Sequence, residues 1–459
     1  MRRSGLPMLP MTGSERRAAA GLAGIFGLRM LGLFLILPVF VLYAPGVAGA
    51  TPLSVGIAVG AYGLTQALLQ IPFGVFSDRI GRKPVIFGGL VLFTLGSLVA
   101  ALAEDIEGVI AGRVLQGSGA IAAAVMALAA DLTREEVRTR AMAGIGMSIG
   151  VAFVLALVVG PALGHWVGLA GMFHFAAVLG VGGILLLLLV VPTPEHSSIH
   201  RDAEPVASQL GRVLKVRELL RLDFGVLTLH LLMTSLFLVI PLSLRNQGLE
   251  AAHHWWIYLP VLLLSMVAMV PFIIQAEGRG RMKPVFLGSV SALALVLAGL
   301  YLLDAGLLWL AFLLVLFFTA FNLLEASLPS LIARLAPADA KGTAMGVFAT
   351  SQFAGAFCGG LLGGWVHQNY GPDAVFLFCA GVVVVWFLVA WPMASPRPVS
   401  NQVVRIGAGT ATDGTALQGR LLEIPGVEEA VVATDEGLAY LKVDKARLDW
   451  ARLRDTAGA

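Results

Sequence analysis

Long apolar runs separated by short polar segments make up the first 395 residues of the chain. A helix needs about 20 apolar residues to cross about 30 Å of hydrocarbon, and each run is long enough to do so. The pattern therefore predicts an all-α membrane protein with twelve transmembrane helices. The predicted spans are residues 20–43, 53–76, 84–103, 107–130, 139–165, 169–192, 221–244, 252–276, 284–303, 307–334, 340–367 and 373–394.

A polar stretch at residues 193–220 divides the twelve spans into two sets of six. We expect a first six-helix bundle over residues 1–192, a cytoplasmic linker over 193–220 and a second bundle over 221–395. Three segments recur at an offset of about 200 residues, which indicates a duplicated unit related by an axis along the membrane normal. The recurring pairs are 78–84 with 277–284, 138–144 with 341–346, and 164–166 with 363–365.

Hydropathy falls after residue 395, where a proline-rich segment, residues 395–398, forms a short stiff linker. The patterns beyond it predict strands at 403–406, 427–434 and 438–443 and helices at 411–422 and 445–454. The order βαββα indicates a small α+β ferredoxin-like domain over residues 400–459, with a final strand that is short or missing. We expect this domain either to regulate the membrane region or to be a solvated appendage.

The composition agrees with the span pattern, since 58% of the residues are hydrophobic and only 13% are charged. With a mean hydropathy of +0.87, the chain has more apolar surface than a soluble core can bury, which excludes a soluble protein. The net charge is +3, but the bases are spread over short loops, so we expect no nucleic-acid partner. Because positive loops stay in the cytosol, we predict a multi-pass protein of the cytoplasmic (inner) membrane with both termini cytosolic.

The loop between the second and third spans, residues 74–84, combines glycines, one acid and several bases. Gly74 permits close helix approach, and Gly81 permits the tight turn that reverses the chain. Asp78 is placed to accept hydrogen bonds from backbone N–H groups at a helix N-terminus. The loop resembles motif A of the major facilitator superfamily (MFS), and the matching residues are Gly74, Asp78, Arg79, Gly81, Arg82 and Lys83.

An acid after the fourth span accompanies motif A in that family. The two form a charge network that latches the outward-facing state. The resemblance implies this role for Asp131, which we expect to pair with Arg82 or Arg79. A solvated loop acid is the alternative.

Two further segments resemble motifs of the same family. Residues 113–120 resemble motif B, whose buried arginine is associated with proton movement; the alternative is that Arg113 extends to the outer interface. Gly160, Pro161 and Gly164 match motif C in part, which favours efflux. We expect Pro161 to kink the fifth span and the glycines to allow close crossing against the other half. A purely structural kink is the alternative.

Glu325 in the tenth span is the carboxylate that lies well inside a predicted helix. Such a group faces water or a partner when ionised, and it can follow the proton gradient when it is protonated. His230 and Arg29 lie at comparable distance from the cytoplasmic ends of their spans. We predict that Glu325, Arg113, His230 and Arg29 carry proton coupling. The alternatives are a salt bridge for Glu325 and a structural role for His230.

Polar residues at middle depth are candidates for lining a solute pathway. Tyr62, Gln66 and Gln70 recur at intervals of four residues and so share one helix face. The other candidates are Asn322, Ser351 and Gln352. Each alone could be an interhelical hydrogen bond. With an otherwise apolar lining, they favour an amphipathic or lipophilic solute over a sugar phosphate, which would require convergent bases.

Residues 29–38, 321–330 and 341–347, with the cytosolic tail, resemble the YajR group of proton-driven MFS drug antiporters. The resemblance implies a secondary transporter, not an enzyme, that exports its solute by alternating access. A nutrient facilitator or symporter, and a membrane sensor or scaffold that signals through residues 400–459, remain alternatives. We expect a monomer whose partners are a small-molecule solute, protons and the lipid bilayer. No metal or other cofactor is expected, since both cysteines lie in apolar runs.

Overall fold

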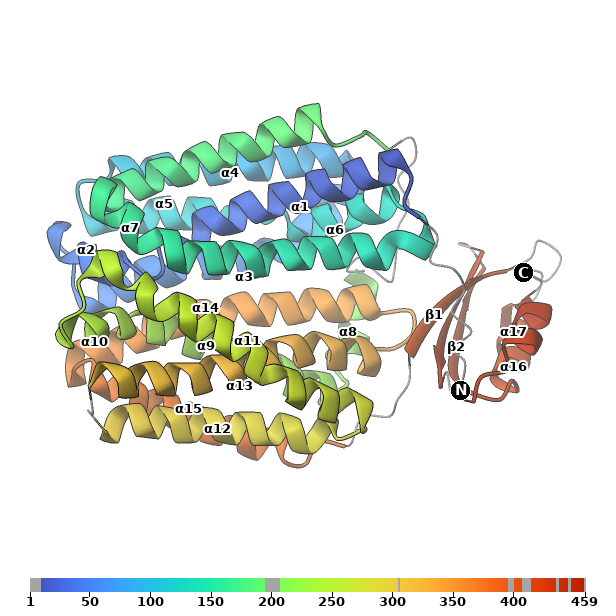
Figure 1. The fold of residues 1–459 in the computed structure, drawn as a ribbon. Coiled ribbons are helices and arrows are strands. Elements are labelled where there is room, and N and C mark those ends of the chain that lie inside the picture. Colours follow the sequence, from blue (N-terminus) through green and yellow to red (C-terminus); the bar gives the residue numbers. More distant parts are fainter. Residues whose placement is uncertain are drawn as a thin grey trace.

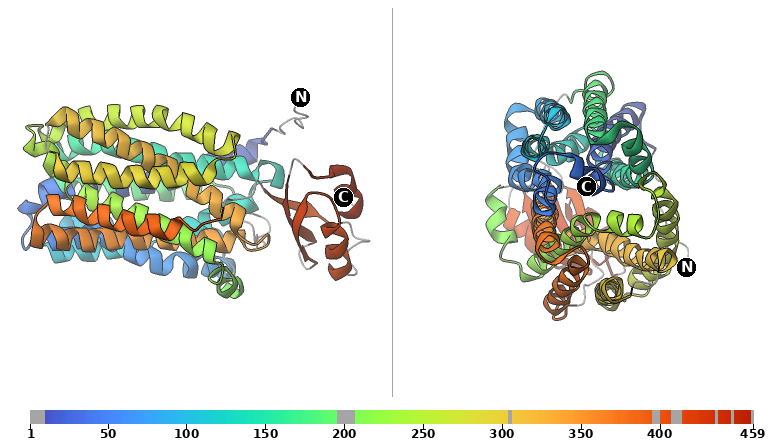
Figure 2. Two further views of the ribbon diagram at one scale, coloured as in Figure 1. Left: turned by 90° about the horizontal axis from the view of Figure 1, so that it is seen from below. Right: turned by 90° about the vertical axis from the view of Figure 1, so that its left-hand side faces the viewer.

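A computed structural model describes residues 10–194, 207–303, 306–394, 400–406, 414–434, 437–444 and 447–457. Two groups of helices lie side by side, one from the first half of the membrane region and one from the second (Figures 1 and 2). The small C-terminal domain lies beyond one end of both groups (Figure 1). We call this end the domain end and the opposite end the distal end.

The first half begins with a capping box, in which Thr12 and Glu15 each satisfy the other's backbone N–H. Its elements are α1 (Gly13–Phe34), α2 (Phe40–Tyr43), η1 (Ala44–Gly46), α3 (Pro52–Ile80), α4 (Arg82–Leu102), α5 (Ile106–Ser118), α6 (Ala122–Asp131) and α7 (Glu135–Leu189). The capping box lets the helix α1 start seven residues before residue 20, where the predicted span begins.

The second half follows a linker of which residues 195–206 lie outside the described residues. Its elements are η2 (Ala207–Gln209), α8 (Leu210–Val213), α9 (Arg217–Phe237), α10 (Ile240–Asn246), η3 (Ala251–His253), α11 (Trp255–Ile273), η4 (Ile274–Gly278), α12 (Met282–Leu302), α13 (Leu307–Leu335), α14 (Lys341–Tyr370) and α15 (Asp373–Ala390). The element η4 is a π-helix that continues α11.

Eleven helices among the described residues are long and apolar enough to cross a membrane. The longest, α7, has 55 residues and contains a reversal at Gly168, whose φ of +64° lies in the region that favours glycine. Its two arms, one on each side of Gly168, are separate crossings, and Figure 1 shows them as two helices. Counting both arms gives the twelve predicted crossings.

Three predicted spans are interrupted helices. The first breaks at residues 35–39, where Pro38 has no N–H to donate, and the seventh breaks at residues 238–239, just before Pro241. The fourth breaks at residues 119–121 between α5 and α6. Here Gly119 lies so close to α4 that an added Cβ would stand 2.1 Å from the Gly89 oxygen. The prediction of continuous helices at these places was wrong, because hydropathy does not report backbone hydrogen bonding.

The two halves contact each other through a glycine seam, which we define as Gly56, Gly60 and Gly63 of α3 with Gly360 and Gly364 of α14. A Cβ added at Gly56 would lie 2.1 Å from the Gly360 oxygen, and one at Gly360 would lie 2.3 Å from the Gly56 oxygen. The seam covers the half of each helix that is nearer the distal end. The backbones therefore touch there without side chains between them.

The C-terminal domain is a three-stranded antiparallel sheet with two helices. Its elements are β1 (Ser400–Arg405), α16 (Gly414–Leu422), β2 (Val427–Ala433), β3 (Leu438–Val443) and α17 (Trp450–Ala457). The sheet order β1-β3-β2 is the central part of the predicted ferredoxin-like arrangement. The predicted starts of the two helices, residues 411–413 and 445–446, lie outside the described residues. The prediction of a helix at residues 447–449 was wrong, because these residues form a turn and loop before α17 begins at Trp450.

One face of this sheet docks on the loop between α13 and α14. Ala433 and Tyr440 bury Ala338 of that loop, and the Glu429 carboxylate accepts a hydrogen bond from the Ala338 N–H at 3.2 Å. The next residue, Asp339, accepts a hydrogen bond from Arg212 of α8 at 2.5 Å. The loop therefore connects the C-terminal domain to the linker helix at the domain end.

Candidate functional site

Three polar side chains of the second half meet at middle depth, each from a different helix. Gln352 of α14 lies 2.7 Å from His230 Nε2 of α9 and 3.4 Å from Glu325 Oε1 of α13. The His230 Nε2 and Glu325 Oε2 atoms are 3.9 Å apart, too long for a hydrogen bond but within range of an ion pair. We call these residues the acid–histidine cluster.

Both ring nitrogens of His230 have neighbours that can take part in hydrogen bonds. The Nδ1 atom lies 3.2 Å from the Val226 carbonyl, which can only accept, so Nδ1 donates to it. The Nε2 atom lies 2.7 Å from the Gln352 amide and 3.9 Å from Glu325 Oε2. A proton at Nε2 would therefore face both of these side chains.

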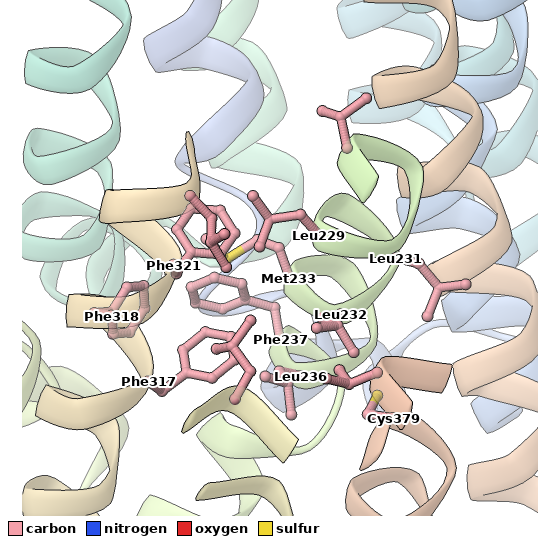
Figure 3. Close-up of a cluster of buried hydrophobic side chains, with 14 of the residues drawn as sticks. Leu229, Leu231, Leu232, Met233, Leu236, Phe237, Phe317, Phe318, Phe321 and Cys379 are labelled. Atoms are coloured by element: carbon pink, nitrogen blue, oxygen red, sulfur yellow. The ribbon is translucent and has the colours of Figure 1, made fainter. Parts of the chain in front are cut away.

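The cluster is open to solvent on one side and apolar on another. The Glu325 side chain is 37% exposed and that of His230 is 18% exposed. Phe321 lies beside His230, with a ring distance of 6.3 Å. Figure 3 shows Phe317 and Phe321 pointing toward Met233 and Phe237, which form an aromatic and thioether wall next to the cluster.

The structure places the remaining predicted pathway residues of the second half around this cluster. Asn322, one turn before Glu325 on α13, donates to Ser265 Oγ of α11 at 3.2 Å. Ser351 is half-buried next to Gln352. Asn322 therefore makes the interhelical hydrogen bond that was its alternative interpretation.

A second polar group occupies the middle of the first half. Arg29 of α1 donates through Nη2 to Gln66 Oε1 at 2.8 Å and to the Gly119 carbonyl at 2.7 Å. Gln66 in turn donates to Gln70 at 2.7 Å. The α5 helix ends at Ser118, so the Gly119 carbonyl accepts both from Arg29 and, at 2.9 Å, from the Ile121 N–H, and the negative end of the α5 dipole faces the guanidinium group. The break in the fourth span thus creates an acceptor for Arg29.

Arg113 lies near Arg29 and is 98% buried, so the alternative that it extends to the outer interface was wrong. It donates to the Ala58 carbonyl at 3.1 Å, the Val59 carbonyl at 3.1 Å and Gln116 at 2.9 Å. The two guanidinium carbons lie 5.6 Å and 5.4 Å from the centroid of the Tyr62 ring. We call Arg29, Arg113, Tyr62, Gln66 and Gln70 the arginine network.

Tyr62, Gln66 and Gln70 share one helix face, and all three are at most 4% exposed. In this conformation they fill the interior of the first half rather than line an open pathway. Tyr62 reaches the boundary between the halves, since its ring contacts Phe353 of α14 at 6.2 Å. A solute pathway along this face remains a prediction.

The motif A loop turns at Gly81, whose φ of +98° requires glycine as predicted. Arg82 donates to Asp78 and, at 2.8 Å, to Ser77, and its Nε lies 3.5 Å from Asp131 at the end of α6. The side chains of Arg82 and Asp131 are 2% and 1% exposed. The predicted partner of Asp131 is therefore Arg82, and the alternative of a solvated loop acid was wrong.

Within this loop Asp78 binds Arg82, four residues later, whereas the sequence predicted backbone N–H donors of a neighbouring helix. Lys83 donates to the Val191 carbonyl at 2.6 Å and so joins the start of α4 to the end of α7. Gly74 accepts from the Ser77 hydroxyl at 2.7 Å. The contact of Lys83 had no signal in the sequence, because nothing in the pattern pairs residue 83 with residue 191.

The motif C glycines make close contacts within the first half. A Cβ added at Gly160 would lie 2.8 Å from the Leu35 carbonyl, and one at Gly164 would lie 3.1 Å from the Tyr43 ring. Pro161 lies inside α7 between them. The expectation that these glycines cross against the other half was wrong. They accommodate the broken segment of the first span, where Pro38 interrupts the helix.

Comparison with known protein families decides the class of the chain. The profile of the Major Facilitator Superfamily matches residues 22–359 and 279–424. The chain belongs to this superfamily. A second profile, the YajR YAM domain, matches residues 405–447 of the C-terminal domain. The protein is therefore a multi-pass membrane transporter and not an enzyme, and the alternative of a sensor or scaffold is not supported.

The similar sequences are transporters of bacteria. The chain is 47% identical over 434 residues to the inner membrane transport protein YajR of Escherichia coli, covering 95% of each. It is 33% identical to an uncharacterized transporter of Buchnera aphidicola, covering 73% of this chain and 86% of that one. Identity to the multidrug resistance protein MdtH of Cronobacter sakazakii is 26%, over 79% of this chain and 90% of that one.

Solved structures share the fold of the membrane region. A bacterial homologue of the human lysosomal transporter Spinster matches with a TM-score of 0.63 at 14% identity, covering 83% of this chain and 98% of that one. The nucleoside transporter NupG matches with a TM-score of 0.63 at 15% identity, covering 82% and 99%. At these identities the similarity concerns the fold alone.

Proposed function

We propose that this MFS transporter exports a small amphipathic solute across the cytoplasmic membrane in exchange for protons. The observation that carries the proposal is the acid–histidine cluster, in which a partly exposed carboxylate and an imidazole lie 3.9 Å apart on two different helices. A carboxylate and an imidazole at this distance can both bind a proton, and the charge of each group then changes beside the other. Two relatives, one named for inner membrane transport and one for multidrug resistance, support export as the function.

Protonation would change the contacts between three helices. In the neutral state, Gln352 of α14 holds His230 of α9 and Glu325 of α13 together through its amide. A proton on His230 Nε2 makes that nitrogen a donor, so it repels the Gln352 amide and attracts Glu325. A proton on Glu325 instead removes the charge that attracts the ring. Proton occupancy is thereby linked to the packing of α9, α13 and α14.

The arrangement of the halves supports an assignment of this conformation within the transport cycle. The glycine seam joins the halves toward the distal end, and the acid–histidine cluster is partly exposed to solvent. If the domain end is cytosolic, as the basic loops predict, this conformation faces the cytosol. Protons would then exchange with the cytosol at the cluster, and separation of the seam would open the other side.

The test compares Glu325→Gln with the parent chain in proteoliposomes, using ethidium, tetraphenylphosphonium and naphthalene-1-acetate as probes. An amide cannot change charge, so we expect the variant to lose accumulation driven by a pH gradient while it still exchanges probe for probe. Asp373→Asn at the exposed start of α15 makes the same chemical change and should behave as the parent does.

Two outcomes would contradict the proposal. Gradient-driven accumulation in Glu325→Gln equal to that of the parent would remove the cluster from coupling. Proton flux in the same direction as the probe would indicate symport, and probe movement that ignores the pH gradient in the parent would indicate a facilitator.

A further inference from the structure

The arginine network holds two positive charges in the interior of the membrane region. Arg29 is 1% exposed and Arg113 is 2% exposed. Among the described residues, neither forms an ion pair with a carboxylate. Buried charge of this kind is costly unless acceptors surround it, so each guanidinium nitrogen needs a partner.

The two arginines differ in how well they are satisfied. Arg113 donates through Nε, Nη1 and Nη2 to acceptors of α3 and α5. Arg29 donates through Nη2 alone, and its Nε and Nη1 are buried and have no acceptor among the described residues. The hydroxyl of Tyr62 is also buried without a partner. The unmatched atoms therefore belong to two side chains in contact, and each of them can donate a hydrogen bond.

We propose that Arg29 and Tyr62 form an anion site that binds the carboxylate group of an amphipathic solute. A carboxylate accepts through two oxygens and would satisfy Arg29 Nε, Arg29 Nη1 and the Tyr62 hydroxyl together. It would also neutralise part of the charge of the arginine network. This proposal rests on the proposed export function and names the substrate class.

The surroundings of the site fit an apolar body attached to one charged group. The Phe93 ring centroid lies 6.0 Å from the Arg29 guanidinium carbon, on the side of α4. Phe353 of the second half covers Tyr62 at 6.2 Å. Because Phe353 belongs to the other half, movement of the halves would uncover the site. A sugar phosphate fits less well, since Arg113 has its nitrogens already engaged.

The structure also changes the argument from sequence. The absence of convergent bases in the sequence pattern had favoured an amphipathic or lipophilic solute over a sugar phosphate. Arg29 and Arg113 are 84 positions apart in the chain (113 − 29), yet both contact the Tyr62 ring. Their guanidinium carbons lie 5.6 Å and 5.4 Å from the ring centroid. The expected solute is therefore an aromatic or aliphatic carboxylate.

The experiment measures binding of naphthalene-1-acetate to the purified full chain, with the neutral naphthalene-1-acetamide as the matched probe. Charged hydrogen bonds in a buried site predict about tenfold or more tighter binding of the acetate than of the amide. Arg29→Gln should lower acetate affinity about tenfold and leave amide affinity unchanged, and Arg29→Lys should restore part of the loss.

Tyr62→Phe keeps the volume of the site and removes one donor, so about fivefold weaker acetate binding is expected. This variant tests the anion site if Arg29→Gln does not fold. Arg16→Gln, an exposed position of the same helix α1, should bind both probes as the parent does. Equal binding of acetate and amide by the parent, or unchanged acetate binding in the folded variants, would overturn the anion site.

Failure of the anion site and failure of the export function give different results. A chain that binds the acetate selectively but does not couple transport to protons refutes the export proposal alone. A chain in which Glu325→Gln abolishes gradient-driven transport, while Arg29→Gln leaves acetate binding unchanged, refutes the anion site alone.

Discussion

The two halves of the membrane region place charge at middle depth in different ways. The first half contains permanent charges, Arg29 and Arg113, which are at most 2% exposed and are held by fixed carbonyl and amide oxygens. The second half contains titratable groups, Glu325 and His230, which are 37% and 18% exposed. A permanent charge can be buried if acceptors are built around it, whereas a group that exchanges protons needs access to water.

The loops at the domain end also differ between the halves, with a buried ion pair in the first half and an exposed one in the second. In the first half, Arg82 holds Asp131, and both side chains are almost fully buried. In the second half, Glu277 pairs with Arg334 at 3.2 Å, and the two side chains are 54% and 28% exposed. Asp131 precedes Arg138 by seven residues, as Arg334 precedes Lys341 by seven, so the repeat places an acid in one half where the other has a base.

The largest expected effect comes from Arg113→Ala. The change leaves the Gln116 oxygen and two backbone carbonyls without their donor, and it creates a cavity, so we expect a loss of about 3 kcal/mol or more in unfolding free energy. Glu325→Gln, in a partly exposed cluster, should cost less than about 1 kcal/mol. The midpoints of thermal unfolding in detergent compare the two. Equal losses would remove the contrast between the halves.

Asp78→Asn should have an intermediate effect. It weakens the charged hydrogen bond to the buried Arg82, and this loss exceeds the gain from removing an acid in the last turn of α3, so we expect a net destabilisation of about 1 kcal/mol. Because the loop matches motif A, the loss should fall on the outward-facing state and leave the protein folded. Distances between spin labels at Leu188 and Leu214, exposed residues near the domain end of each half, would measure the shift. An unchanged distribution would contradict a latch.

Glu277→Gln should have the smallest effect. Exposed ion pairs contribute about 0.2 to 1 kcal/mol, so the same label distances should shift less than in Asp78→Asn. Raising the salt concentration should reduce this small shift further, because exposed charges are screened. A shift as large as that of Asp78→Asn would mean that the loops of the two halves act as equal latches.

Hydropathy and loop charge predicted the class of fold, because spanning a membrane imposes length and composition on every helix. The same pattern did not predict the breaks at Pro38, Gly119 and Pro241. A broken helix remains apolar, and its freed carbonyls are satisfied by distant residues, as Gly119 is by Arg29. Breaks therefore depend on tertiary partners that a window of sequence does not contain.

For the candidate site, too, the sequence predicted some features and not others. Residue type alone singled out Glu325, His230 and Arg113, because charge inside a span is rare. Which of them meet could not be predicted, since the contacts cross helices that are distant in sequence. Gln352 was assigned to a solute pathway, and the sequence did not show that its side chain contacts both His230 and Glu325. Arg29 was assigned to proton coupling, and its neighbours are an amide, a carbonyl and two aromatic rings.

The glycine seam has a consequence for the rate of the transport cycle. Interlocked side chains must change rotamer before two helices separate, and each rotamer change adds to the activation barrier. Gly56 and Gly360 meet backbone to backbone, so this contact can part and reform without rotamer changes. This contact therefore adds no rotamer change to opening and closing at the distal end.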